Sequence, residues 1–217
     1  MYKFAMAIFF AAFSGVAAFA QTTSTDYKKA EVFVGYSNNQ VDTGVSPNDD
    51  FSDLVDDRES FHGFNVSGVY NFSRYLGVKA DVSGTYNKKE YDFAVPVTGG
   101  TGNVSFDTDS SLYNFLGGIQ IKDNASTSRL KPFAHILAGA GHGRVKVNNV
   151  NCDITVDCTG FSGTSSETGL AGAFGGGLDI KLSDRIDLRA IQIDYNPIRF
   201  DNATTHNVRF GIGLVFK

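Results

Sequence analysis

The sequence has little of what marks several common classes of protein. It has no tryptophan, and 2 cysteines in 217 residues exclude a disulfide-rich scaffold. Only 4 prolines accompany 24 glycines, which excludes a collagen, while 19% charged and 42% hydrophobic residues exclude a disordered polymer and a coiled coil. Lysine and arginine number 19 against 23 acidic residues. Without an excess of positive charge, nucleic acid is not expected as a partner.

The first twenty residues have the pattern of a cleaved secretory signal. Lys3 supplies a positive start, an almost unbroken apolar stretch runs from Phe4 to Phe19, and Ala18-Phe19-Ala20 has the small-x-small form that signal peptidase accepts. A retained anchor is the alternative, but the stretch is short for a helical span of roughly 20 residues and no basic stop-transfer cluster follows it. We predict a signal peptide over 1–20 and one mature domain over 21–217.

The mature part contains no apolar run close to the roughly 18 residues of a membrane helix. Apolar residues instead recur at every second position, which is typical of strands. The clearest example is VRFGIGLVFK at 208–217, where Phe210, Ile212 and Leu214 share one face. Similar segments lie at 31–37, 64–71, 78–86, 113–121, 133–139, 170–180 and 186–195. The sequence therefore predicts eight strands and an all-β fold.

The segment 186–195 interrupts its own alternation. Gln192 and Asp194 have the opposite parity to Asp187 and Arg189, so a regular strand would place them on the oily face. One extra residue near Ala190 restores the polar face. We predict a β-bulge at this point.

The spacers between these segments alternate in length. Long spacers cover about 38–60, 88–109, 146–165 and 197–203, and short links cover 71–75, 123–129 and 181–185. Transmembrane barrels join their strands by short periplasmic turns and longer extracellular loops. The pattern predicts an eight-stranded antiparallel up-and-down transmembrane β-barrel.

The distribution of charge predicts which face of the barrel is inside. One face carries Gly, Ser, Asn, Gln and isolated charges, and the other carries Val, Ile, Leu and Phe. A closed barrel satisfies its own backbone and can cross hydrocarbon, provided that enclosed charges pair. We expect a side-chain-filled lumen with a polar network of Glu31, Lys79, Asp81, Asp179, Arg189, Asp194 and Arg209. Aromatic girdles are expected from Tyr36, Tyr70, Tyr86, Tyr113, Tyr195 and Phe216.

Four segments resemble the outer-membrane β-barrel domain family, which includes the N-terminal barrel of outer-membrane protein A. They are NFSRYLGVKADVSGTY (71–86), PFAHILAGAG (132–141), FGGGLDIKLSDRIDLRAIQIDY (174–195) and the closing VRFGIGLVFK. The resemblance covers nearly all of the mature chain. It implies a place in the outer membrane of a Gram-negative bacterium, contact with outer-membrane lipid and lipopolysaccharide, and insertion by the barrel-assembly machinery. Such chains usually end in an aromatic residue, whereas here Lys217 follows Phe216.

The third long spacer contains both cysteines, Cys152 and Cys158. In a chain exported to an oxidising compartment we expect them to form a disulfide, worth about 2 kcal/mol for a ring this short. Two further ligands for a metal are not in place. The first spacer is acidic but lacks the spacing of a calcium loop, so we interpret it as a solvated surface loop, with cation binding as the alternative. Its acidic residues are Asp42, Asp49, Asp50, Asp53, Asp56, Asp57 and Glu59.

The four histidines do not form a recognisable catalytic pattern. None has a serine two residues further along its face, and His135 is interpreted as a hydrogen-bonding residue of the lumen. We expect no catalytic residue, cofactor or metal, and a non-enzymatic barrel with a structural or surface-interaction role through its long loops. The alternatives are a lipid-modifying barrel enzyme, a narrow pore for small solutes, and a soluble barrel in which Phe210, Ile212 and Leu214 point inward.

Overall fold

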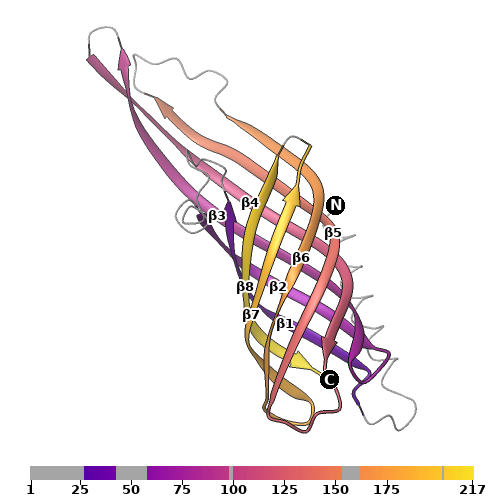
Figure 1. Ribbon diagram of the computed structural model, residues 1–217. Helices are drawn as coiled ribbons and strands as arrows, with labels where there is room; N and C mark the ends of the chain where they lie inside the picture. The colour runs from indigo at the N-terminus through magenta and orange to yellow at the C-terminus, as the bar shows by residue number, and fades with distance from the viewer. Residues whose placement is uncertain (1–26, 43–57, 98–99, 153–161, 202) are drawn as a thin grey trace, which may run out of the picture.

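Eight strands form a closed barrel in the computed structural model, which describes residues 27–42, 58–97, 100–152, 162–201 and 203–217 (Figure 1). All neighbouring strands are antiparallel and consecutive, and β1 also pairs with β8, so the predicted eight-stranded antiparallel barrel is confirmed. Among the described residues, no helix is long and apolar enough to cross a membrane. The strands are β1 (Ala30–Asp42), β2 (Arg58–Asn71), β3 (Leu76–Val97), β4 (Gly100–Lys122), β5 (Leu130–Cys152), β6 (Gly163–Lys181), β7 (Ile186–Arg199) and β8 (Thr204–Phe216).

Apolar side chains cover the outside of the barrel. Ile136 is 64% exposed, whereas Arg209 is 1% exposed. On β8, Phe210, Ile212 and Leu214 are 39%, 48% and 39% exposed. The soluble-barrel alternative required these three side chains to point inward and is therefore wrong.

The predicted β-bulge lies in β7. Leu178 of β6 pairs with Ile191 and the next residue, Asp179, pairs with Arg189, so Ala190 is the additional residue. The pairing of β7 with β8 shifts at the same place. Beyond the bulge, Gln192 and Asp194 are buried, as expected.

The long spacers predicted at 88–109 and 146–165 are wrong in large part. Residues 88–97 pair with 100–109, β5 continues to Cys152, and β6 already begins at Gly163. The spacer predicted at 197–203 is shorter, because β7 ends at Arg199 and β8 begins at Thr204. The charged run from Lys88 to Glu90 interrupts the alternation of β3, which is why the spacer was predicted there. The residues at 91, 93, 95 and 97 do alternate, so the sequence held a signal for this extension that the prediction missed.

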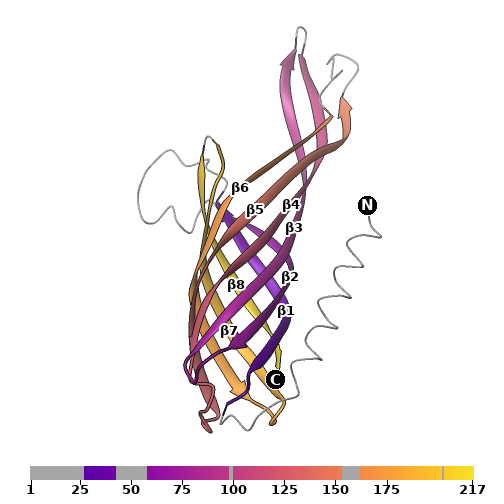
Figure 2. The same cartoon turned by 90° about the vertical axis from the view of Figure 1, so that its right-hand side faces the viewer.

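The outer parts of β3 to β6 leave the barrel together on one side (Figure 2). β2 stops pairing with β3 at Tyr86, whereas β3 continues for another eleven residues to Val97. We call this extension the projecting sheet; it comprises residues 88–97, 100–109, 146–152 and 163–164.

Aromatic side chains lie on the outer surface near both ends of the barrel. Toward the projecting sheet, Tyr86 packs edge-on against Tyr113 at 5.7 Å, and Tyr195 stacks on His206 at 6.0 Å. Tyr36 likewise stacks on His62. Tyr70 and Phe216 are exposed at the end of the barrel that carries the short turns. The histidines were not predicted in this position.

Candidate functional site

The structure places all seven predicted network residues inside the barrel, none more than 3% exposed. Arg209 on β8 joins two of them: its Nη1 donates to Asp81 Oδ1 at 2.8 Å and its Nη2 donates to Asp194 Oδ2 at 2.7 Å. Arg209 Nη1 also donates to Ser83 Oγ at 3.0 Å. A guanidinium with its fixed fork of donors can satisfy two carboxylates at once, which is the condition for keeping them charged in a closed interior.

A second cluster contains Lys122, which was not predicted. Lys122 Nζ donates to Asp179 Oδ2 at 2.8 Å and to Glu31 Oε2 at 2.9 Å. Asp179 also accepts from Arg189 Nε at 2.8 Å. The predicted strand ended at Ile121, one residue too early; the parity of Gln120 would have placed Lys122 on the same inner face.

His135 and Lys79 complete the polar interior. Lys79 Nζ lies 3.8 Å from Asp81 Oδ2 and 3.3 Å from His135 Nδ1. His135 Nε2 in turn lies 2.9 Å from Asp194 Oδ1. The interpretation of His135 as a polar residue of the interior agrees with this placement.

Two aromatic rings enclose the Arg189 guanidinium. Its central carbon lies 4.4 Å from the Phe33 ring centroid and 4.0 Å from that of Phe133. Such stacking stabilises an enclosed cation without adding a counter-charge. Both phenylalanines have the inward parity in the sequence, but alternation alone gives no sign that they hold an arginine.

The interior is not polar along its whole length, contrary to expectation. A cluster of buried apolar side chains lies in the half nearer the projecting sheet, where Val41 and Phe200 pack against it. Some members lie at or beyond the ends of the predicted segments. Others lie within a segment but were not assigned to either of its faces. The members of the cluster are Phe61, Leu112, Leu116, Leu137, Ala171, Ala173 and Ile198.

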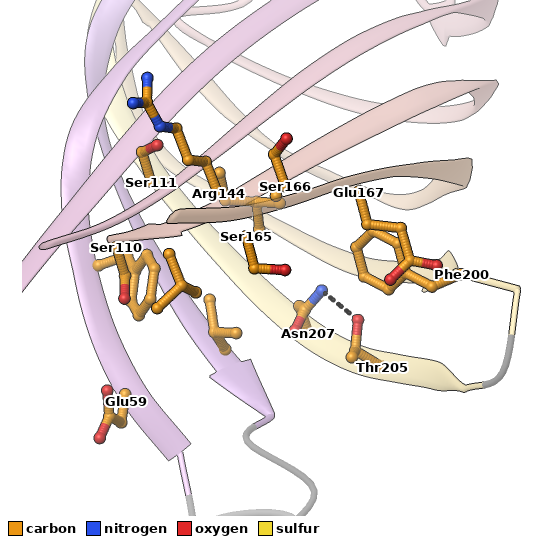
Figure 3. Close-up of a pocket in the computed structure, with 15 residues that line it drawn as sticks. Glu59, Ser110, Ser111, Arg144, Ser165, Ser166, Glu167, Phe200, Thr205 and Asn207 are labelled. Carbon is orange, nitrogen blue, oxygen red and sulfur yellow. Dashed lines mark hydrogen bonds between the residues drawn. The ribbon is translucent and has the colours of Figure 1, made fainter. Parts of the chain in front are cut away.

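A cavity of about 350 Å³ lies above this apolar cluster, at the mouth of the barrel (Figure 3). We call it the outer cup. Its apolar wall is formed by Val41, Phe61, Leu112, Val145 and Phe200. The other lining residues are Gly143 and the polar residues Glu59, Ser110, Ser111, Arg144, Ser165, Ser166, Glu167, Thr205 and Asn207. The cup was not predicted, and of its lining only Glu59 was named beforehand, as part of the acidic first spacer.

Comparison with known proteins identifies the family. The profile of the outer membrane protein beta-barrel domain matches residues 6–216. The chain belongs to this family. No curated protein sequence matches the chain. Family membership implies the outer membrane of a Gram-negative bacterium, and the short turns of such barrels are periplasmic.

The fold of this outer-membrane barrel is shared with a solved structure. Ail, the attachment invasion locus protein of Yersinia pestis, crystallised in complex with the heparin analogue sucrose octasulfate, is 21% identical, with a TM-score of 0.53 over 87% of this chain and 98% of Ail. Neisserial surface protein A is 15% identical, with a TM-score of 0.49 over 87% of this chain and 96% of its own.

The periplasmic turns of the barrel are joined by an exposed ion pair. Arg74 donates to both carboxylate oxygens of Asp123 at 2.9 Å, linking the β2–β3 and β4–β5 turns. This hydrogen bonding holds the pKa of Asp123 below its ordinary value. In the β6–β7 turn, a hydrogen bond from Lys181 at 2.7 Å likewise lowers the pKa of Asp184. Exposed pairs of this kind contribute little stability.

Several features predicted for this outer-membrane barrel lie wholly or partly outside the described residues. Cys152 ends β5, but Cys158 and residues 1–20 lie outside, so the disulfide and the signal peptide stay predictions. Of the acidic spacer, residues 49–57 also lie outside. Glu59 pairs with Lys89. No group of three potential metal ligands occurs within the described ranges.

One serine and one histidine lie near each other on the outer face. They do not fit the predicted pattern, because Ser60 precedes His62 rather than following it. Asn38 Nδ2 donates to Ser60 Oγ at 2.9 Å and lies 3.1 Å from His62 Nδ1, so the amide stands between the two groups. In the described part of the chain Ser60 and His62 form no hydrogen bond with each other. The contact that a histidine base needs with a serine nucleophile is thus missing here.

Proposed function

We propose that this outer-membrane barrel is a non-enzymatic surface-contact protein that presents the projecting sheet to partners outside the cell. The observation that supports this proposal is strand length. β3, β4 and β5 have 22, 23 and 23 residues, whereas a membrane span needs only about 9 to 11. The excess on these strands lies on the side away from the periplasmic turns, where it forms an ordered sheet.

The projecting sheet is held in shape by polar contacts between its strands. Lys88 Nζ lies 3.1 Å from Asp109 Oδ1, and Asn148 Nδ2 donates to Asp109 Oδ2 at 2.8 Å. Asn149 Nδ2 donates to Asp107 Oδ2 at 2.6 Å. Cross-strand pairs of this kind stabilise a sheet. A sheet of fixed shape loses less conformational freedom on binding than a flexible loop would.

We do not propose that this chain binds a sulfated sugar, as Ail does in its crystal structure. Lys88 pairs with Asp109 and Lys89 pairs with Glu59, so these cations are already neutralised. We infer that the partner recognises a polar surface of mixed charge rather than a positively charged patch.

Shortening the projecting sheet should abolish surface contact without disturbing the barrel. Lys88 and Asp109 pair directly, so replacing residues 89–108 with Asn-Gly closes the strands by a two-residue hairpin turn. We expect bacteria that display this variant to adhere to cultured host cells no better than bacteria lacking the gene. Outer-membrane amounts must be matched, and the variant must keep its heat-modifiable gel migration. Adherence equal to that of the full-length protein contradicts the proposal.

We also infer that the barrel does not conduct solutes. The ion-pair clusters and the apolar cluster occupy the interior, and an eight-stranded barrel is just wide enough for its side chains to fill. Planar-bilayer recordings of the purified protein should therefore show no stable conductance step. A reproducible large step would favour the narrow-pore alternative.

Export and processing form a further part of the proposal. We infer that residues 1–20 are removed, that Cys152 and Cys158 are joined, that the outer surface contacts lipid and lipopolysaccharide, and that the barrel-assembly machinery inserts the chain. Intact-mass measurement of protein from outer membranes should give a chain beginning at Gln21, in which a maleimide labels cysteine only after reduction. Labelling of the unreduced, denatured protein would contradict the disulfide.

A further inference from the structure

The outer cup exposes apolar surface to water at a place where the membrane cannot cover it. Phe61 and Leu112 form part of its base, and Phe200 packs at its side. Val145 is 45% exposed, although its inward parity on β5 directs it into the cup rather than to lipid. Covering such surface is favourable, and pockets for small molecules are typically built in this way, from apolar walls with a few polar groups.

The cup is closed at its base. The buried apolar cluster fills the barrel immediately below it, with Leu137 1% exposed and Ile198 fully buried. A molecule that enters from outside therefore cannot pass on through the barrel. The volume of about 350 Å³ is at the small end of the range of small-molecule sites. The geometry suits a ligand of one or two rings or a short chain.

The polar groups of the cup favour a neutral ligand. Glu59 is paired with Lys89, and Glu167 Oε1 accepts the backbone N–H of Asp201 at 3.0 Å, so neither acid requires a cation from the ligand. Arg144 also lines the cavity, but its guanidinium points away from Ser165 and Glu167 (Figure 3). An anionic ligand would thus meet two carboxylates and no inward guanidinium.

Of the serines that line the cup, two lie in register with the inward-facing Val145 and offer hydroxyl groups for hydrogen bonding with a ligand. Ser110, Val145 and Ser165 lie side by side on β4, β5 and β6. Neither serine hydroxyl has a hydrogen-bond partner among the described residues. Thr205, by contrast, is already engaged, because its Oγ1 accepts from Asn207 at 3.2 Å (Figure 3). The free hydroxyls can fix the orientation of a ligand whose body lies on the apolar wall.

We propose that the outer cup binds a small, uncharged, largely apolar molecule that carries a hydrogen-bonding group and reaches the protein from outside the cell. This function is independent of adhesion by the projecting sheet, because the cup lies in the mouth of the barrel itself. The protein would take up its ligand without transporting it.

The test uses N-phenyl-1-naphthylamine, an uncharged apolar fluorophore with one N–H group, and the folded protein in lipid nanodiscs. We expect a saturable rise in fluorescence with one site per barrel, in addition to the linear partition into lipid that empty nanodiscs show. Gly143→Leu should remove the saturable part. A Cβ at Gly143 would lie 3.5 Å from the Phe200 ring, in ordinary contact, so the new side chain fills the cup without displacing the backbone.

Gly68→Leu is the matched control, because Gly68 lies on the outer face with no atom within 4 Å of an added Cβ. It should keep the saturable binding. If Gly143→Leu fails to fold, Ser165→Phe fills the cup from β6, where the side chain is exposed, and should have the same effect. Absence of saturable binding to the unmodified protein, or its persistence in folded Gly143→Leu and Ser165→Phe, would overturn the proposal.

Discussion

Replacing Arg209 with methionine should destabilise the folded barrel by about 3–5 kcal/mol. Methionine is unbranched and apolar but shorter than arginine by two atoms, so Asp81 and Asp194 would each lose a hydrogen-bonded cation while remaining buried. Most of the cost arises from the enclosed carboxylates and a smaller part from lost packing. Urea titration in detergent, followed by the shift between folded and unfolded gel mobility, measures the change.

The source of this cost can be tested by removing the carboxylates as well. The triple variant Arg209→Met, Asp81→Asn, Asp194→Asn should recover a large part of the lost stability, because uncharged amides are less costly to enclose. Arg199→Met is the control: this arginine is exposed at the end of β7, and its loss should change stability by less than about 0.5 kcal/mol. An unchanged urea midpoint for Arg209→Met would show that the ion pairs contribute nothing.

Replacing Gly213 with alanine should impair closure of the barrel, at a cost of about 3 kcal/mol. Gly213 on β8 faces Gly35 on β1, where the first and last strands meet. A Cβ at Gly213 would lie 2.4 Å from Gly35 Cα and 2.4 Å from Val34 O. Both are backbone atoms, so the strands themselves must separate. The yield of the faster-migrating folded form after refolding measures the effect.

Gly211→Ala is a close control for this experiment. Gly211 is on the same face of β8, two residues earlier, but the nearest atom to an added Cβ is Gln192 Cβ at 3.5 Å, an ordinary contact. This variant should fold as well as the unmodified protein. Equal loss in both variants would mean that glycine is needed for backbone conformation in general rather than for close approach at the seam.

Alternation in the sequence predicted the parts of the fold that contact lipid. A strand in contact with hydrocarbon must place apolar side chains outward, and this requirement produced a readable pattern from Val32 to Phe216. The same rule located the bulge at Ala190, because Asp194 would otherwise have faced lipid. The seven charges of the network followed from parity as well, since each sits on the face opposite the apolar residues.

The features that the sequence did not reveal are those where the apolar alternation is interrupted or where both faces share one character. Lys88, Lys89 and Glu90 interrupt the alternation of β3, so the strand was predicted to end there. The residues at 91, 93, 95 and 97 resume an alternation that could have indicated the extension. Leu112 and Leu137 are apolar residues on the inner face, where the pattern called for polar ones. The outer cup depends on side chains from six strands meeting at one level, which no local pattern records. Long-range pairing, not local preference, creates such a site.

The seam between β1 and β8 joins the first and last strands of the barrel, so the ring cannot close until both are present. Val32 pairs with Phe216, so residues near opposite ends of the described chain must meet before the ring is complete. Until then, the interior arginines have no enclosure and the lipid-facing surface has no continuous wall. An open sheet exposes unpaired strand edges, so the polypeptide must be kept from aggregating until the ring is closed.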